Sequence, residues 1–345
     1  MMTFFKIPKP IETYLALLIV FPILQSCNND DPVNPDKQEH VYVAGGINSR
    51  TASGVWIDST FIKLTENQTH TLCTSVFISG EDIYVCGTTY GGGKDVQCWK
   101  NGNLLPFERT DYNGLPQYVT VSGNDVYLCG QIKEKSDAAF LAVYWKNGKF
   151  IKLENQKASL ANAMQIVGSD IYVVGWARFP RESAMIWING IATRLNSEAF
   201  KSYASGIKVV GNDVYVSGWT EDSLGTGKAL YWKNGVEYNL TAPGINGAAT
   251  DIFIDGSDIY FSGDLYTLDS LYTPVYWKNG VVTTLGDYNT YNYASSIFVK
   301  DGDVYVSGSY GSKEKSKGVY WKNGNKVVLP ADTSMTSYTQ CIFVK

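Results

Sequence analysis

Residues 296–300 read Ser-Ile-Phe-Val-Lys, residues 304–308 read Val-Tyr-Val-Ser-Gly, and residues 318–324 read Gly-Val-Tyr-Trp-Lys-Asn-Gly. A fourth apolar run, Lys-Val-Val-Leu, follows at 326–329. Short runs rich in β-branched and aromatic residues, separated by turn residues, are typical of β-strands. The runs are apolar on both faces, as in strands that are covered on both sides. This stretch therefore predicts a unit of four short strands.

The same unit recurs seven times along the chain. One tyrosine in the second strand and one tryptophan in the third strand return at intervals of 42 to 46 residues. The tyrosines are Tyr42, Tyr84, Tyr127, Tyr172, Tyr215, Tyr260 and Tyr305, and the tryptophans are Trp56, Trp99, Trp145, Trp187, Trp232, Trp277 and Trp321. A period of this length indicates a repeat architecture. Seven four-stranded units predict an all-β fold, a seven-bladed β-propeller.

The two ends of the repeat region complete one blade between them. The first unit starts at His40 without an innermost strand, and the chain ends with a lone apolar strand at 340–345. Joining the two hides strand edges that would otherwise pair with other chains. An open solenoid would instead need polar capping repeats, which the sequence lacks. We therefore expect residues 40–345 to form a ring, closed by pairing of the C-terminal strand with the N-terminal blade.

Two kinds of turn separate the strands of each unit. Asn-Gly, the strongest signal for a tight hairpin, follows the tryptophan in six units, whereas the first unit has Ile57-Asp58-Ser59 and is expected to turn differently. The turn between the first two strands carries an aspartate in six units, at positions 82, 125, 170, 213, 258 and 303. Because aspartate in a turn can bond to its own backbone, we expect these six residues to be structural.

In its Tyr-Trp-Lys-Asn-Gly repeats the chain resembles bacterial propeller lipoproteins, and at the level of architecture WD40 and kelch propellers. The resemblance covers residues 40–345 and implies the fold. Its motif residues belong to the scaffold, so the resemblance implies no catalytic or binding position.

The first forty residues have the features of an export signal. Lys6 and Lys9 precede an apolar run at 14–24, which has the length of a signal-peptide core and is too short to span a bilayer. The run ends in Leu-Gln-Ser-Cys, which resembles a lipobox, and this resemblance implies cleavage that leaves Cys27 as a lipidated N-terminus. The following Asn-Asn-Asp-Asp, at 28–31, is similar to the acidic export signals of Bacteroidota surface lipoproteins. The alternative is a plain secretory signal with an incidental cysteine.

We accordingly expect three segments: a lipoprotein signal peptide at 1–26, the lipidated Cys27 with a flexible tether at 27–39, and the propeller at 40–345. Acyl chains would hold the domain at the cell envelope, at the outer membrane, by burying methylene groups in the bilayer. The membrane would be contacted only through this anchor.

Composition excludes several classes of partner. The net charge is −4 and lysine and arginine are not clustered, which argues against nucleic acid. The chain has two histidines and no cysteine–histidine spacing typical of zinc sites, so we expect no metal and no cofactor. The sequence also lacks a nucleophile elbow.

Length variation points to one face of the propeller. The distance from each tryptophan to the next repeat tyrosine is 27 or 28 residues, whereas the distance from the glycine that ends the second strand to the tryptophan ranges from 11 to 15. Variation is thus confined to the loops between second and third strands. These loops share one face with the connections between blades, and insertions confined to one face often mark a binding surface.

Residues that break the repeat give the candidate site. Trp176 and Trp219 directly follow the strand-ending glycine in neighbouring units, and Asp264 holds the same position in the next unit. Asp251 departs from its own repeat position near the start of an innermost strand, and Arg178 lies just after Trp176. Indole rings stack on flat apolar faces such as those of sugars, and carboxylates accept hydrogen bonds from hydroxyl groups. We therefore expect these residues to bind a ligand at one rim.

Three functions fit this sequence. The first is non-catalytic binding of a glycan or protein ligand on that face. The second is a glycoside hydrolase or lyase, since two blades could bring paired carboxylates together. The third is a structural subunit of an envelope complex. For the two tryptophans themselves, the alternative to ligand binding is that they only seal the core between blades. Tyr203, Tyr293 and Tyr338 share a rim position and are expected to serve packing.

Replacing Cys27 by alanine should release the protein from the membrane fraction, because no thiol would remain to carry the acyl chains. Fractionation of cells and mass spectrometry of the mature N-terminus test this, with Asn28→Ala as the control. Unchanged membrane retention of Cys27→Ala, with no lipid on the wild-type N-terminus, would contradict the predicted anchor.

Overall fold

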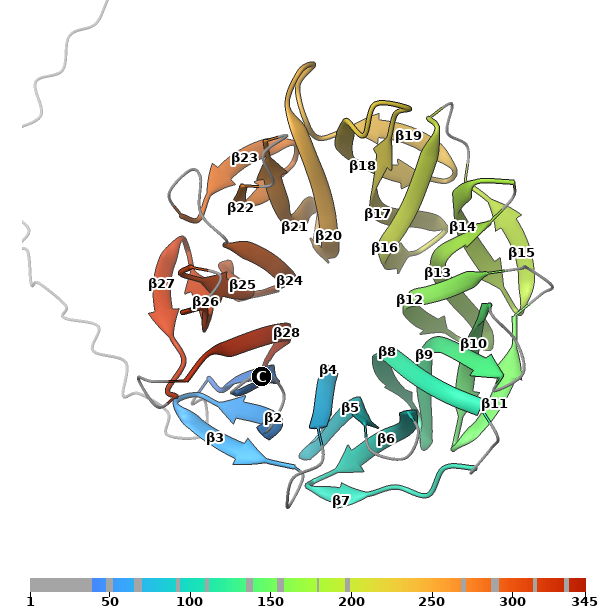
Figure 1. The fold of residues 1–345 in the computed structure, drawn as a ribbon, viewed down its shortest axis with the longest axis vertical. Helices are drawn as coiled ribbons and strands as arrows, with labels where there is room; N and C mark the ends of the chain where they lie inside the picture. The colour runs from blue at the N-terminus through green and yellow to red at the C-terminus, as the bar shows by residue number, and fades with distance from the viewer. Residues whose placement is uncertain are drawn as a thin grey trace, which may run out of the picture. The chain divides into compact units, whose positions relative to one another are not determined.

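Residues 39–345 fold into a ring of seven four-stranded antiparallel sheets, or blades (Figure 1). The structure, a computed structural model, describes residues 39–47, 52–64, 70–90, 94–108, 112–134, 139–153, 158–178, 180–195, 199–267, 271–286, 292–312, 315–331 and 335–345. The predicted signal peptide, Cys27 and all but the last residue of the predicted tether lie outside the described residues. The described residues form no helix long and apolar enough to cross a membrane.

The strands follow one another from the ring centre outward in every blade. Blade 1 is made of β28 (Ser337–Val344), β1 (Val41–Ile47), β2 (Ala52–Ile57) and β3 (Thr60–Lys63). Blade 2 contains β4 (His70–Ser79), β5 (Asp82–Tyr90), β6 (Lys94–Lys100) and β7 (Asn103–Leu104), and blade 3 contains β8 (Tyr112–Ser122), β9 (Asp125–Glu134), β10 (Phe140–Lys146) and β11 (Lys149–Lys152). Blade 4 contains β12 (Ser159–Val167), β13 (Asp170–Arg178), β14 (Glu182–Ile188) and β15 (Ile191–Arg194), and blade 5 contains β16 (Lys201–Val210), β17 (Asp213–Glu221), β18 (Gly227–Lys233) and β19 (Val236–Asn239). Blade 6 contains β20 (Asn246–Asp255), β21 (Asp258–Tyr266), β22 (Tyr272–Lys278) and β23 (Val281–Thr284), and blade 7 contains β24 (Tyr293–Lys300), β25 (Asp303–Tyr310), β26 (Lys317–Lys322) and β27 (Asn325–Val328).

The predicted closure of the ring is confirmed. Strand β28 pairs with β1 in antiparallel register, from Val41 opposite Val344 to Ile47 opposite Ser337. Two further backbone hydrogen bonds of 3.0 Å join His40 and Lys345, one in each direction. The last strand of the chain thus supplies the innermost strand of the blade that the first strands begin.

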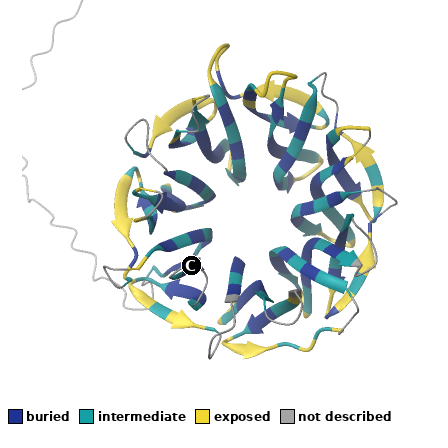
Figure 2. Ribbon diagram, in the orientation of Figure 1, coloured by how far each residue is buried: buried dark blue, intermediate teal, exposed yellow. Residues whose placement is uncertain are grey.

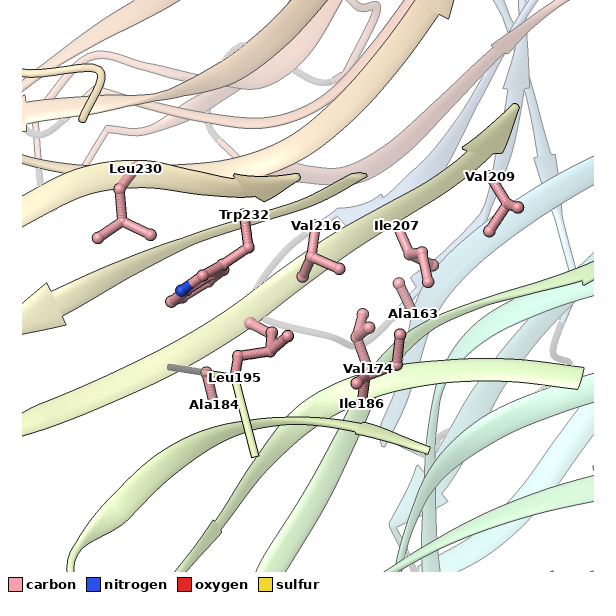
Figure 3. Packing of buried hydrophobic residues seen from close by; sticks show 11 residues of the cluster. Ala163, Val174, Ala184, Ile186, Leu195, Ile207, Val209, Val216, Leu230 and Trp232 are labelled. Atoms are coloured by element: carbon pink, nitrogen blue, oxygen red, sulfur yellow. The ribbon is translucent and has the colours of Figure 1, made fainter. Parts of the chain in front are cut away.

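The repeated tryptophan of the third strand forms the core between blades. All seven are at most 4% exposed. Trp232 of blade 5, for example, packs with Val216 and Leu230 against Ile186 and Leu195 of blade 4 (Figure 3). Burial is concentrated in the inner strands, and the outermost strands are exposed (Figure 2). Each blade buries its faces against its two neighbours. Replacing one such tryptophan by alanine is therefore expected to lower the free energy of unfolding by about 3–5 kcal/mol.

The two turns of each unit meet at one face of the ring, which we call the bottom face. In blade 5 the Asn-Gly turn has φ of 51° at Asn234 and 80° at Gly235, as a tight hairpin requires. The Asn234 carboxamide accepts a hydrogen bond from Val214 N (2.8 Å) and donates one to Asp213 (2.8 Å). Lys233, from the same turn, forms an ion pair of 2.9 Å with Asp213. The aspartate is therefore structural, as predicted, but it bonds to side chains of the neighbouring turn rather than to its own backbone.

Blade 1 keeps this turn with a different residue. Asp58 replaces the asparagine, adopts a φ of 54° and accepts a hydrogen bond from Val41 N (2.9 Å). Its other carboxylate oxygen lies 2.8 Å from His40 Nδ1. Asp58 thus takes the role of the asparagine. The turn still differs from the other six, as expected, because Ser59 does not adopt the positive φ that glycine has at this position.

The cysteines of the repeat region are buried free thiols, at positions 73, 86, 98, 129 and 341. Burial raises their pKa values, that of Cys86 to about 12, so these thiols stay protonated and act as small core residues.

The opposite side of the ring, which we call the top face, carries the loops between second and third strands and the connections between blades. The innermost strands therefore start at the top face and end at the bottom face.

Deleting residues 339–345 should lower the free energy of unfolding strongly, because it removes most of β28 and leaves β1 as an open edge. Removing the buried Ile342 and Val344 side chains alone costs about 3–6 kcal/mol. Urea denaturation tests this, with Lys345→Ala as a control that keeps the backbone pairing. Equal unfolding midpoints for the deletion variant and the wild type would contradict the closed ring.

Candidate functional site

Two of the predicted site residues lie on either side of a tyrosine at the top face. The indole of Trp176 meets the ring of Tyr203 edge-on, with 6.0 Å between centroids, and Tyr203 stacks on Trp219 at 4.1 Å and 20°. All three side chains are partly buried. We call Trp176, Tyr203 and Trp219 the aromatic cluster.

Strand pairing explains how these three rings meet. Tyr203, near the start of β16, lies directly opposite Trp219, near the end of β17. Directly opposite residues in an antiparallel pair place their side chains on the same face of the sheet, within contact distance. Trp176, near the end of β13, approaches from the neighbouring blade. The cluster therefore bridges blades 4 and 5.

Two ion pairs lie beside the aromatic cluster. Arg178 pairs with Glu182 at 2.6 Å, across β13 and β14, and Lys201 pairs with Glu221 at 3.0 Å, across β16 and β17. The hydrogen bond from Arg178 lowers the pKa of the Glu182 carboxyl. Burial raises the pKa of the Tyr203 phenol, and the charges of the four groups act on that pKa more weakly. Arg178, predicted to bind ligand, thus already has a carboxylate partner, although its side chain is 56% exposed.

Asp264 has the same repeat position as the two tryptophans but a different environment. Its side chain is buried, and Oδ1 accepts a hydrogen bond of 2.9 Å from Ala294 N in blade 7. Burial raises the pKa of this carboxyl well above its ordinary value, an effect that outweighs the opposing hydrogen bond. The structure therefore places Asp264 in a link between blades, outside the candidate binding surface.

Asp251 lines a pocket of about 230 Å³ in the centre of the ring, whose described lining includes neither tryptophan. Its Oδ2 accepts hydrogen bonds from Ser296 Oγ (2.7 Å) and from Ile297 N (3.2 Å), both in blade 7. Burial raises the pKa of Asp251, and the positive charge of Lys208 in blade 5 opposes that rise. The structure thus brings Trp176, Trp219 and Arg178 together and puts Asp251 in a second place, the central pocket.

Sequence reasoning misses two features of this face. It assigns Tyr203 to packing with Tyr293 and Tyr338, although Tyr203 alone lies between the two additional tryptophans. It also misses the polar residues that line the central pocket. A signal for them exists, because the position just before that of Asp251 is polar in all seven repeats.

Among the described residues, no group of three His, Cys, Asp or Glu side chains is arranged to hold a metal ion.

No protein-family model and no curated protein matches the sequence. Among solved structures, the chain is similar to an ulvan lyase described as a new family of polysaccharide lyase, with a TM-score of 0.50 and 10% identity, over 88% of this chain and 96% of the lyase. A mutant of the lectin from Aleuria aurantia in complex with α-methyl-L-fucoside gives a TM-score of 0.42 and 12% identity, over 76% and 95% of the two chains. At such identity the similarity to the lyase supports the propeller fold alone.

Replacing Asp264 by asparagine should stabilise the protein at neutral pH, because the amide oxygen can still accept the bond from Ala294 N and no buried charge remains. The raised pKa means that the folded state binds a proton more tightly than the unfolded state. The stability that Asp264 contributes is therefore greatest below the ordinary value of 3.8 and falls as the pH rises through the folded pKa.

Urea unfolding from about pH 4 to pH 8 measures this difference between wild type and Asp264→Asn. Asp264→Ala serves as the comparison, since it leaves Ala294 N without a partner and should cost about 1–3 kcal/mol. Stability curves of wild type and Asp264→Asn that run parallel over the whole interval would contradict the assigned role.

Proposed function

We propose that this protein is a non-catalytic cell-envelope lipoprotein that binds a glycan through the top face of its propeller. The observation that carries the proposal is the aromatic cluster, a partly exposed group of three rings at the junction of blades 4 and 5. Aromatic rings stack on the apolar face of a sugar and contribute apolar burial without requiring a charge on the ligand.

The ion pairs beside the cluster supply the complementary polar contacts. A carboxylate has about four lone-pair positions, so Glu182 and Glu221 can accept hydrogen bonds from sugar hydroxyls while they remain bonded to Arg178 and Lys201. The guanidinium of Arg178 has five donors, and the two bonds to Glu182 leave others for a ligand oxygen. Rings flanked by such donors and acceptors suit a hydroxylated ligand.

A protein ligand is the second candidate, because tryptophan, tyrosine and arginine are also the residues that dominate protein–protein interfaces. Catalysis is not part of the proposal. A glycoside hydrolase needs two carboxyl groups facing one substrate, whereas Asp264 is engaged in an interblade hydrogen bond, and Glu182 and Glu221 are each paired with a cation.

The proposal includes the lipid anchor at Cys27 and a location at the outer membrane. Both rest on the sequence of the first forty residues, with its short apolar core followed by Leu-Gln-Ser-Cys. An anchored binding domain would hold its ligand at the cell envelope, which fits a role in capturing glycan rather than transforming it.

Trp219→Ala should weaken glycan affinity by about 1–3 kcal/mol, because the sugar would no longer bury its apolar face against this ring. A glycan array with the purified protein identifies the ligand, and calorimetry with the best-bound oligosaccharide measures the change. Tyr272→Ala is the matched control, because Tyr272 is an exposed aromatic residue at the start of β22 on the same face, outside the cluster.

Two outcomes would contradict the proposal. One is an array without binding, which a pull-down with envelope proteins would then follow to test the protein ligand. The other is a decrease of about 3–5 kcal/mol in the folding stability of Trp219→Ala, the cost of truncating a large buried core residue. Such a decrease would assign Trp219 to packing.

A further inference from the structure

A β-bulge recurs at one position in the innermost strand of every blade. The register with the second strand shifts there in all seven sheets, so that one residue has no direct partner. The residues are Thr74, Gln117, Asn162, Ser205, Thr250, Ser295 and Gln340. All seven are polar, and all seven line the central pocket. Bulges re-aim a side chain and are common beside functional sites.

Four of these side chains hold the ring together. Each donates a hydrogen bond to a backbone carbonyl in the innermost strand of the next blade. The bonds run from Thr74 to Pro116 O (2.9 Å), from Asn162 to Ala204 O (2.7 Å), from Thr250 to Ala294 O (3.2 Å) and from Ser295 to Thr339 O (3.0 Å). Their polarity is explained by this link between neighbouring blades.

The other three side chains are not used in this way. Gln117, Ser205 and Gln340 form no side-chain hydrogen bond to the rest of the described structure. They come from blades 3, 5 and 1, so bonded members of the ring, Thr74 and Asn162, lie between them. Two carboxamides and one hydroxyl group are thus available at the pocket from three directions.

A layer of aromatic rings lies nearer the bottom face than the pocket lining. A phenylalanine lies three residues after the bulge in four innermost strands, at positions 77, 253, 298 and 343. The ring centroids of Phe253 and Phe298 are 4.7 Å apart, and those of Phe298 and Phe343 are also 4.7 Å apart. Phe77 lies 5.5 Å from Phe343. The ammonium group of Lys208 lies 5.2 Å from the ring centre of Phe253. The central pocket is therefore a polar recess above a layer of aromatic rings.

The central pocket offers little free charge to a ligand. Asp251 is the carboxylate in the lining, and Lys208 is the nearby cation that favours its ionised form. The Asp251 oxygens accept bonds from Ser296 Oγ and from two backbone N–H groups, so this carboxylate is largely satisfied without a ligand. The described lining contains no lysine or arginine for an anionic ligand, and its one carboxylate already accepts hydrogen bonds from the protein.

We infer that the central pocket binds a small uncharged polyhydroxylated molecule of the monosaccharide class, with Gln117, Ser205 and Gln340 as its hydrogen-bonding partners. Carboxamides and hydroxyl groups both donate and accept, as sugar hydroxyls do, and the three groups reach one pocket from different blades. Tyr118, the aromatic residue of the pocket lining, provides a ring for the apolar face of a sugar. The inference rests on other residues than the aromatic cluster and holds independently of the proposed function.

Titration with a panel of free monosaccharides and with myo-inositol, followed by saturation-transfer NMR and calorimetry, tests the inference. Gln117→Ala and Gln340→Ala should each weaken binding by about 2- to 10-fold, which is the range for one hydrogen bond. The double variant should weaken it further. Gln97→Ala, which removes a carboxamide from β6 outside the pocket, should leave affinity unchanged.

Further variants separate this pocket from the rest of the molecule. Binding that responds to Gln117→Ala and Gln340→Ala belongs to the central pocket, whereas binding that responds to Trp219→Ala belongs to the aromatic cluster, because Trp219 lies outside the pocket lining. Ser295→Ala should lower the melting temperature, because its hydroxyl is used between blades, whereas Gln117→Ala and Gln340→Ala should not.

Three results would overturn the inference: no binding of any member of the panel, unchanged affinity in the folded double variant, or abolished monosaccharide binding in Trp219→Ala with the double variant unaffected. The last result would place the sugar at the aromatic cluster.

Discussion

The structure depends on burial of apolar surface between blades, which requires every blade to have a neighbour on both sides. The repeated tryptophan of the third strand lies in that interface in all seven blades and is almost fully buried in each. A linear row of blades would leave one such face open at each end. Pairing of β28 with β1 removes both open ends at once, because it uses the two halves of one blade as the joint. The closed ring then fixes the position of every innermost strand around the centre.

Within this ring the two faces have different chemistry. The bottom face repeats one arrangement of asparagine, aspartate and lysine, in which the aspartates at 82, 125, 213, 258 and 303 each have a lysine partner at 2.7–2.9 Å. Exposed pairs of this kind add little stability individually, but they occupy the polar groups of the turns. The top face carries the loops of variable length, and its residues at the repeat-breaking positions differ from blade to blade. The aromatic cluster is accordingly found where the repeat is broken.

The fold follows from the sequence, and the candidate site follows only in part. Trp176, Trp219 and Arg178 can be recognised because they break a regular pattern, and the structure brings them to the junction of blades 4 and 5. The same reasoning cannot separate Asp264 from the tryptophans, because all three share one repeat position and differ only in what the next blade presents. The sequence does not reveal the role of Tyr203 for a related reason. Its two counterparts, Tyr293 and Tyr338, suggest packing, but the positions equivalent to Trp219 in their blades, 309 and 46, are not tryptophan.

The sequence by itself determined the number of blades, the strands and turns within them and the way in which the ring closes. These features depend on short-range patterns: β-branched and aromatic runs within a strand, Asn-Gly in a hairpin turn and a tryptophan at a fixed place in each unit. Only the tertiary structure decided which polar side chains already form hydrogen bonds to a neighbouring blade. The hydroxyl of Ser295 is bound to the next blade, while that of Ser205, at the same repeat position, has no partner among the described residues, and their local sequences give no reason for the difference. The partner of each bonded bulge residue lies in the next blade, 42 or 44 residues away, so its position is set by packing around the ring and not by the residues beside it.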